Sequence, residues 1–289
     1  EARDFAPPIP TPIAYHEYRA GGGYACYGEC ATGRRSAHDV IALLDDARLR
    51  GMGGAGFPAG RKWRAVLSEP RPRYVAVNID EGEPGTFKDR RCLELDPHRF
   101  LEGALIAAWA IEADAIYLYL RDEYAGCRLA LERELALLRA TPPVPGAPVV
   151  SIHLRRGAGA YICGEESAMI ESIEGKRGLP RLRPPYVAQR GLFGLPTLEH
   201  NIETLFWIPA IIERGAAWFA AQGRHGRSGL RAYSVSGRVQ RPGVHVAPAG
   251  ITVRELIDEF AGGMLPGHRL YAYLPGGASG GILPASLGD

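Results

Sequence analysis

Two patterns of apolar residues alternate along the first half of the chain. Apolar residues at helical spacing, such as Val40, Leu43 and Leu44, predict helices over three segments: residues 36–50, 97–113 and 123–140. Short apolar runs rich in β-branched and aromatic residues predict buried strands over three others: residues 73–79, 115–120 and 149–154. Strands that alternate with helices at these distances predict βαβ units and a mainly parallel sheet, so the expected fold class is α/β.

The second half of the chain changes character near residues 225–229. Helical patterns run over residues 164–175 and 200–223, the latter with a break expected at Pro209. Two short strands and a helix that opens at Thr252 then predict a second, smaller domain. We therefore expect three parts: a Pro-rich N-terminal arm (residues 1–35, extended over 1–13), an α/β domain (residues 36–228) and a C-terminal domain (residues 229–289).

Composition and charge narrow the class of protein. The 289 residues are 46% hydrophobic and carry a net charge of +2, which is ordinary for a globular protein and does not favour nucleic-acid binding. The longest apolar stretch, residues 103–111, is too short to span a bilayer, so membrane insertion is not expected. Five cysteines without a C-x-x-C pair and the lack of a signal-peptide pattern favour a cytoplasmic protein. The histidines show no metal-ligand spacing. Cys26 and Cys30, four residues apart, could be ligands, but two lone thiols are more often unmetallated, so no metal site is predicted.

The segment Arg50–Gly60 contains a G-x-G-x-x-G pattern. A Rossmann dinucleotide site requires a strand before this pattern and a helix after it. Here the preceding residues have helical spacing, and Phe57-Pro58-Ala59-Gly60 are expected to end any helix. Five glycines still favour a backbone that a ligand approaches closely, with Lys62 able to reinforce anion binding, although a structural turn is the alternative. The glycines are Gly51, Gly53, Gly54, Gly56 and Gly60.

Polar residues follow the first predicted strand. Asn78, Asp80, Glu81 and Glu83 stand where the strand 73–79 ends, which is the ligand edge of an open α/β sheet. Asparagine and carboxylate side chains at such an edge suit hydroxyl or amide groups of a ligand. The alternative for this segment is a solvated acidic loop that caps the next element.

A second Gly-rich loop, residues 155–164, leads into Glu165 and Glu166 and then the cationic tract 176–185. No nucleophile–base pair and no P-loop is present. These features favour binding of a phosphorylated, ring-bearing cofactor that supplies its own reactivity. Phe57, Trp63 and Tyr186 are either stacking partners for its ring or core residues.

Four motifs, taken in order, resemble one family. "GMGGAGFPAGRKW", "NIDEGEPGTFKDR", "GAGAYICGEESAMIESIEGKRGLPRLRPPY" and "GLPTLEHNIETL" are similar to the flavoprotein, NADH-binding subunit of respiratory complex I and its relatives in NAD-reducing hydrogenases and NAD-dependent formate dehydrogenases. Residues 233–259 resemble the β-grasp (SLBB, ubiquitin-like) module of that family. The segments "GLPRLRPPYVAQRGLFG" and "LPGGASGGILPASL" are most similar to the β subunit of the molybdenum-containing formate dehydrogenase.

The resemblance implies a Rossmann-like domain that binds FMN and NAD(H) in one cavity and transfers hydride between them. Electrons then pass to or from iron–sulfur clusters of a larger complex, with a thioredoxin-like [2Fe–2S] subunit and a molybdenum or hydrogenase catalytic subunit as expected partners. The implied FMN contacts are Gly51, Gly53, Gly54, Lys62, Asn78, Asp80, Glu81, Gly164, Glu165, His200 and Asn201. The implied NAD contacts are Phe57, Glu83, Glu166, Arg183 and Tyr186, of which Glu83 and Glu166 are expected at the reacting rings.

Three departures from the family pattern qualify these expectations. Ala65 replaces an aromatic residue that helps to stack adenine, and His200 replaces an asparagine near the flavin phosphate. The family also carries a cysteine motif for a [4Fe–4S] cluster, which these 289 residues lack, so the chain is expected to be a fragment or to bind flavin without that cluster. Two alternatives follow: a catalytically silent scaffold subunit, and a Rossmann dehydrogenase that acts alone on a small substrate.

Overall fold

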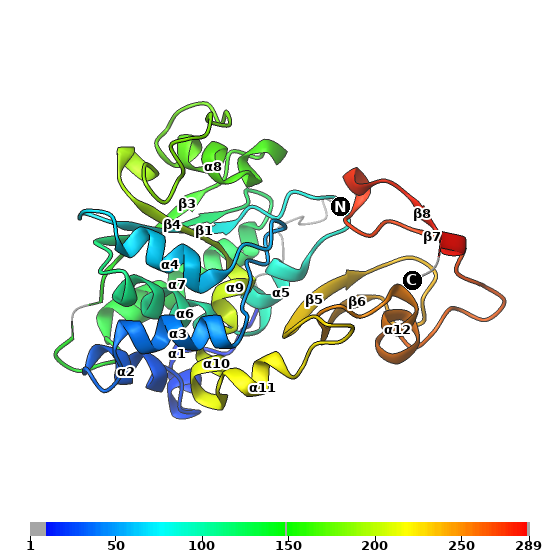
Figure 1. Ribbon diagram of the computed structural model, residues 1–289, viewed down its shortest axis with the longest axis horizontal. Helices are drawn as coiled ribbons and strands as arrows, with labels where there is room; N and C mark the ends of the chain where they lie inside the picture. The colour runs from blue at the N-terminus through cyan, green and yellow to red at the C-terminus, as the bar shows by residue number, and fades with distance from the viewer. Residues whose placement is uncertain (1–9, 148, 288–289) are drawn as a thin grey trace, which may run out of the picture.

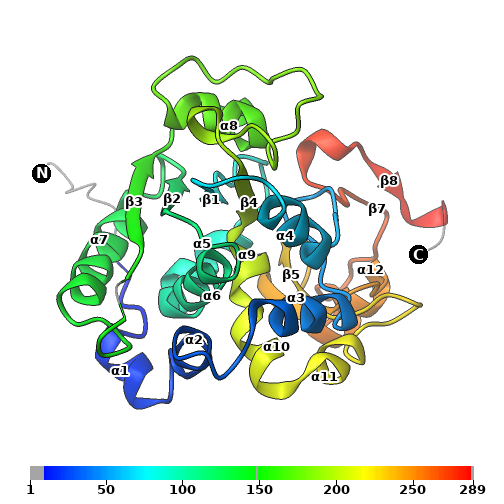
Figure 2. The same cartoon turned by 60° about the vertical axis from the view of Figure 1, so that its left-hand side comes forward.

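A four-stranded parallel sheet forms the centre of the larger part of the molecule. The computed structural model describes residues 10–147 and 149–287. The strands are β1 (Tyr74–Ile79), β2 (Ala115–Leu120), β3 (Ser151–Arg156) and β4 (Thr197–Asn201), and they lie side by side in the order β3-β2-β1-β4 (Figure 2). The α/β fold class and three of the strands agree with the sequence analysis. The fourth strand, β4, is not predicted, because its polar residues form no apolar run.

Helices cover both faces of the sheet (Figure 1). One face carries most of the apolar core, under α6 (Pro97–Ala110), α7 (Ala125–Ala140) and α3 (Ala37–Asp46), while α8 (Glu166–Ile173) lies on the other. Two further helices complete this part: α4 (Ala59–Leu67) and α5 (Lys88–Leu95). Short 3₁₀ turns occupy Tyr161–Gly164 and Leu192–Gly194.

Side chains cap the starts of two of these helices. The Ser36 hydroxyl accepts the Asp39 N–H in a reciprocal capping box at α3, and the Asp96 carboxylate accepts the Arg99 N–H at α6. The segment predicted as one broken helix forms three, α9 (Ile202–Phe206), α10 (Ile208–Arg214) and α11 (Ala216–Ala220). The first break lies at Trp207, two residues before Pro209, which occupies the first turn of α10, where its missing N–H costs no hydrogen bond.

The described part of the N-terminal arm is helical from Tyr15 onwards, which the sequence analysis did not predict. Helices α1 (Tyr15–Ala20) and α2 (Ala25–Ala31) pack against α7 and α6, respectively. The buried Glu102 carboxylate accepts the Tyr24 and Tyr27 N–H groups at 2.9 and 3.1 Å. These residues therefore belong to the core, and residues 1–9 of the predicted extended segment lie outside the described residues.

The C-terminal part is a small unit with its own apolar cluster. An antiparallel hairpin of β5 (Leu230–Val235) and β6 (Gly243–Pro248) is followed by α12 (Val253–Glu255), which opens at a Thr252 capping box. The helix continues as a π-helical turn over Leu256–Phe260. A tail follows with β7 (Ala272–Tyr273), β8 (Leu283–Pro284) and 3₁₀ turns at Ala278–Gly280 and Ala285–Leu287. The domain boundaries themselves stay a prediction.

Within the described residues, no helix is both long enough and apolar enough to cross a membrane.

Candidate functional site

The strand order places a topological switch point between β1 and β4. The chain runs from β1 to β2 on one side, and β4 lies on the other side of β1. Open α/β sheets bind ligands outside the carboxyl ends of the strands at such a point. Asn78 of β1 and Asn201 of β4 are paired in register there. Two residues from motifs that are distant in sequence thus meet at one edge.

The glycine loop lies on this edge, between α3 and α4. Two hydrogen bonds hold it, from the Gly51 N–H to the Phe57 carbonyl and from the Met52 N–H to the Thr204 hydroxyl, both 2.9 Å. The expectation that no helix follows the loop is wrong, because α4 begins at Ala59, where Pro58 serves as its N-cap residue. The element before the loop is a helix, as predicted, so the strand-to-helix connection of a Rossmann site is still absent.

The exposed side of the loop is open backbone. A Cβ on Gly53 would lie 3.2 Å from the Cβ of Asn201, so the loop rests directly on the end of β4. Gly54 and Gly56 adopt φ values of +123° and +65°, and a Cβ on either would enter open space. From Gly53 to Gly56 the loop therefore presents backbone and the single methyl group of Ala55, a surface that a ligand can approach closely.

Asn78, Asp80 and Gly164 lie together at the carboxyl end of β1, where Asn78 is paired with Asn201. The Asn78 amide donates to the Gly164 carbonyl at 2.9 Å, and its oxygen accepts the Asp80 N–H. Asp80 is buried, and its Oδ2 has no hydrogen-bond partner. Burial raises the pKa of Asp80 to about 6. An unpaired buried carboxylate oxygen is costly, and it marks a place where a ligand donor fits.

Glu81 serves the fold rather than an open cavity. Its carboxylate accepts the N–H groups of Asp89 and Arg90, at the start of α5, and the Tyr124 hydroxyl. This is the capping role that the sequence analysis gave as the alternative for the acidic segment, and at Glu81 the structure supports it. Burial raises the pKa of this carboxyl group.

Glu83 reaches the C-terminal tail. Its Oε2 accepts the Tyr161 hydroxyl at 2.7 Å and the Ser279 hydroxyl at 2.5 Å, and its Oε1 accepts the Ser279 N–H at 2.8 Å. These bonds, those from Ser279 first, hold the pKa of Glu83 below its ordinary value. Neither Tyr161 nor Ser279 was singled out from the sequence, since only the fold brings them to Glu83.

Charged residues gather where α8 begins. Glu165 is the N-cap residue of α8 and accepts the N–H groups of Ser167 and Ala168, while Arg183 bonds to Glu165 and lies 2.9 Å from Glu166. Burial raises the pKa of Glu166, although the Lys62 ammonium, 3.9 Å away, and Arg183 oppose this.

Lys62 is itself engaged by β4. Its ammonium donates to the Glu199 carbonyl at 3.0 Å and to the Glu199 carboxylate at 3.2 Å. The anion-binding role expected for Lys62 would therefore have to compete with carboxylates that it already contacts.

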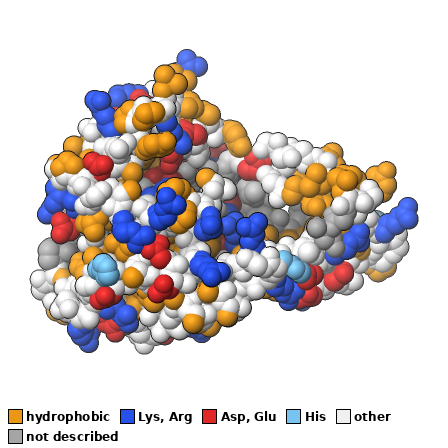
Figure 3. Space-filling model, in the orientation of Figure 1, with side chains coloured by type: hydrophobic (Ala, Val, Ile, Leu, Met, Phe, Trp, Pro, Cys, Tyr) orange, Lys and Arg blue, Asp and Glu red, His pale blue; other side chains and the backbone are white. Residues whose placement is uncertain are grey.

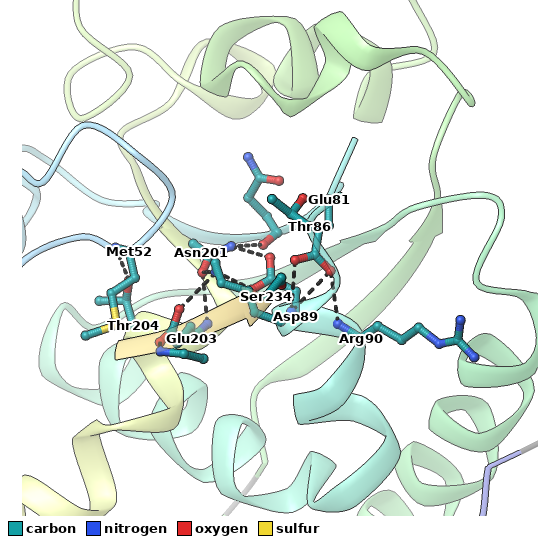
Figure 4. A network of polar contacts seen from close by, with 12 residues as sticks. Met52, Glu81, Thr86, Asp89, Arg90, Asn201, Glu203, Thr204 and Ser234 are labelled. Carbon is teal, nitrogen blue, oxygen red and sulfur yellow. Dashed lines mark hydrogen bonds and ion pairs between the residues drawn. The ribbon is translucent and has the colours of Figure 1, made fainter. Parts of the chain in front are cut away.

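His200 and Asn201 are both buried but differ in their partners. The His200 ring accepts the Trp63 indole N–H at 2.8 Å, and burial holds its pKa well below the ordinary value, so the ring is neutral. Trp63 is fully buried, which makes it a core residue and not a stacking partner for a ligand. The Asn201 amide donates to Asp89 at 2.6 Å and its oxygen accepts the Glu203 N–H, in a network that Figure 4 shows in close view.

The rings expected to hold adenine are exposed. Phe57 and Tyr186 keep 44% and 57% of their surface accessible, and no ring–ring contact joins them in the described part of the chain. The guanidinium of Arg61 lies 5.5 Å from the Phe57 ring, while Ala65 offers no aromatic surface. The surface is notched between the lobe that carries α8 and the C-terminal tail (Figure 3).

No metal-binding group is found within the described residues. Among them, no cluster of three or more His, Cys, Asp or Glu side chains is arranged to hold a metal ion, and all five cysteines are free.

Known proteins share both parts of this architecture. The Nuo51 FMN-binding domain matches residues 44–210, and the SLBB domain matches residues 233–283. An NADH-quinone oxidoreductase subunit of Rhizobium meliloti (strain 1021) is 44% identical over 96% of this chain and 67% of its own length. The mitochondrial NADH dehydrogenase [ubiquinone] flavoprotein 1 of Dictyostelium discoideum is 44% identical over 86% of this chain and 54% of its own length.

A solved structure shows the same fold. The crystal structure of an NAD+-reducing [NiFe]-hydrogenase in the H2-reduced state superposes with a TM-score of 0.82 at 41% identity, over 91% of this chain and 45% of that chain. The chain thus spans between about half and two thirds of the relatives that it matches. It belongs to the family of complex I flavoproteins, in which the Nuo51 FMN-binding domain is followed here by an SLBB domain.

Proposed function

We propose that this chain binds FMN and NAD(H) at the switch-point site and acts as the NADH-oxidising flavoprotein part of a larger redox complex. One observation carries the proposal: a buried Asp80 oxygen without a partner lies 3.8 Å from a Cβ built on Gly164, at the sheet edge where the open backbone of Gly53 rests on Asn201. The glycine loop of residues 53–56, which we call the cradle, allows close approach of a phosphate and a sugar chain. The unpaired Asp80 oxygen can accept a hydrogen bond from a ribityl hydroxyl. The residues present therefore fit FMN.

FMN, when bound, exchanges two electrons with nicotinamide and single electrons with iron–sulfur clusters. The protein's part is to bind and orient. Asp80 would accept a hydroxyl hydrogen, and the glycine loop would admit the cofactor without steric hindrance. Two carboxylates are proposed to orient the nicotinamide ring. One is Glu83, whose carboxylate is held by Tyr161 and Ser279, and the other is Glu166, which lies beside Arg183. No protein acid or base is required at these positions.

The assignments of individual contacts are part of the proposal. Those to FMN are Gly51, Gly53, Gly54, Lys62, Asn78, Asp80, Glu81, Gly164, Glu165, His200 and Asn201. Of these, Glu81 and His200 act through the fold, because the Glu81 carboxylate and His200 Nε2 already accept hydrogen bonds from the protein. Those to NAD are Phe57, Glu83, Glu166, Arg183 and Tyr186.

The electron partner is proposed at the level of class. The relatives are named for quinone reduction and for NAD+-linked hydrogenase activity, so an iron–sulfur protein is the expected neighbour. Formate oxidation by a molybdenum subunit is a narrower proposal, supported only by the resemblance of the sequence segments. A silent scaffold is the competing function, which the same experiment tests.

Loading the purified chain with FMN and measuring NADH-dependent ferricyanide reduction tests the proposal. We expect flavin absorbance and NADH–dye activity. Replacement of Gly54 by Val should abolish flavin binding, because a branched side chain at φ +123° both strains the loop and occupies the cradle. Gly22→Val is the matched control, since Gly22 has φ +90° with open space around it but lies between α1 and α2. A wild-type chain that shows no flavin absorbance once unbound FMN has been removed would overturn the proposal.

A further inference from the structure

Lys88, which is not among the proposed FMN or NAD contacts, lies beneath the cradle. Lys88 is the first residue of α5, and 19% of its side chain is exposed. Its ammonium lies 2.6 Å from Asp89 Oδ1, 3.0 Å from Glu203 Oε2 and 3.2 Å from Asn201 Oδ1. An ammonium has three N–H donors, so these three acceptors account for all of them.

Two of these contacts fix the Asn201 amide. Lys88 binds its oxygen, and Asp89 Oδ2 accepts its N–H at 2.6 Å. Asn201 in turn supports Gly53 of the cradle, where the distance to a built Cβ is 3.2 Å. Displacing the lysine would leave the amide oxygen held by the Glu203 N–H alone and would loosen the floor under the glycine loop.

The third contact leads to the C-terminal unit. Glu203 uses its other oxygen to accept the Ala232 N–H of β5 at 2.6 Å. Ser234, also on β5, accepts the Phe87 N–H at 2.9 Å, immediately before Lys88 in sequence. Figure 4 labels several members of this network, from Met52 and Thr204 at the glycine loop, through Asn201, Asp89 and Glu203, to Ser234 on β5. One network thus joins the cradle to the second domain.

A buried ion pair is weak evidence for a stabilising role, because hydrophobic side chains of similar volume often pack at least as well. What this cluster provides is a fixed geometry. Burial opposes the charge of Lys88, yet Asp89 and Glu203 hold its pKa above the ordinary value, so the ammonium stays charged. The positive charge of Lys88 and the fixed amide of Asn201 therefore lie at the ligand edge of the sheet.

We infer that Lys88 is a positioning residue for FMN, which acts through Asn201 and the glycine loop, and that Glu203 extends this positioning to β5 of the C-terminal domain. The inference rests on the proposed function. It adds a role for Lys88 on α5 and for the β5 backbone to a site that already uses Ser279 of the C-terminal part.

The test measures the FMN dissociation constant, the midpoint potential of the bound flavin and the melting temperature of the flavin-free full chain. We expect Lys88→Met to weaken FMN binding about 10–100-fold, as for other residues that orient a ligand's direct partners. The potential should fall, because a positive charge near the flavin is lost while the carboxylates remain. Lys88→Arg keeps the charge and should restore both values most of the way. Arg90→Met, on the same helix but with its side chain on Glu94, is the control and should change neither.

Glu203→Gln provides a second route if Lys88→Met does not fold. It keeps an acceptor for the Ala232 N–H but removes a negative charge, so the potential should rise. An FMN affinity within twofold of wild type, or an unchanged potential in both variants, overturns the inference even if the melting temperature falls. Loss of FMN binding in the wild-type chain instead overturns the proposed function, so the two failures are distinguishable.

Discussion

At the scale of single residues, Asp80 is the strongest sign of a ligand. The residue is 8% exposed, and one of its carboxylate oxygens lacks a partner. The neighbouring Asn78 is satisfied at both its amide groups, so the local fold is complete except at this oxygen. A group kept in this state lowers stability in the absence of ligand, which is typical of functional sites.

This residue gives the ligand-free protein a defined pH dependence. The carboxyl group has a pKa of about 6 in the folded chain against 3.8 when unperturbed. The folded state therefore binds the proton more tightly, and the free energy of unfolding falls as the pH rises from about 4 to 6, by about 2 kcal/mol. In Asp80→Asn this decrease should be absent in urea unfolding at a series of pH values. Asp258→Asn, which changes an exposed carboxylate, should keep it, and identical slopes for wild type and Asp80→Asn would contradict the assignment.

At the scale of elements, buried carboxylates hold the starts of helices. Glu81 accepts N–H groups at the start of α5, and Glu102 does so at the start of α2. Each satisfies backbone donors that a helix leaves unpaired, and the negative charge suits the helix N-terminus. The N-terminal helices are thus held to α6 by side chains and not only by apolar contact.

Glu102→Ala should release α1 and α2. Two backbone N–H groups and the Tyr18 hydroxyl would lose a buried acceptor, which we expect to cost about 3–5 kcal/mol in the free energy of unfolding. Glu102→Gln keeps an acceptor and should cost less. Urea unfolding measures both, with the exposed Glu132→Ala on α7 as the control, for which about 0.5 kcal/mol or less is expected. Equal losses for Glu102→Ala and Glu132→Ala would show that the carboxylate does not hold the helices.

The C-terminal tail should act on the nicotinamide side of the site. Ser279 supplies two of the hydrogen bonds that orient Glu83, so Ser279→Ala should raise the KM for NADH about 3–10-fold while FMN stays bound. Steady-state kinetics of the FMN-loaded chain measures this. Ser286→Ala, in the same tail, makes no hydrogen bond to Glu83 in the described structure and serves as the control. An unchanged KM in Ser279→Ala would mean that the tail does not position Glu83.

At the scale of the whole molecule, the site draws on both parts of the chain. The cradle lies in the α/β part, while Ser279 and the β5 backbone come from the C-terminal part. Ligand binding at such a place stabilises the folded chain as a unit.

FMN at about 100 times its dissociation constant should add about 2.7 kcal/mol to the free energy of unfolding and raise the melting temperature by about 5 °C or more. Differential scanning fluorimetry over a range of FMN concentrations measures the shift. Riboflavin, which lacks the phosphate, should give a smaller shift. A melting temperature that does not depend on FMN concentration would contradict the site.

The sequence by itself determined much of the framework. Apolar periodicity located three strands and the helices between them, because these segments are long or continuous enough for local pattern to dominate. Cap residues such as Ser36, Asp96 and Thr252 marked helix starts, since capping is a local interaction. Motif order was sufficient to indicate the family, which the relatives confirm.

Only the tertiary structure decided how the motifs meet. The strand Thr197–Asn201 contains Glu, His and Asn, so no apolar pattern predicted it. All five residues are nevertheless buried. Lys62, Trp63 and Asp89 form hydrogen bonds with the Glu, His and Asn side chains, which allows these polar groups to be buried. That strand creates the switch point and sets Asn201 under the glycine loop. Lys88 and Ser279 gained their roles in the same way, through partners 113 and 196 residues away, because hydrogen bonds of this kind depend on position in space and leave no periodic signal in the chain.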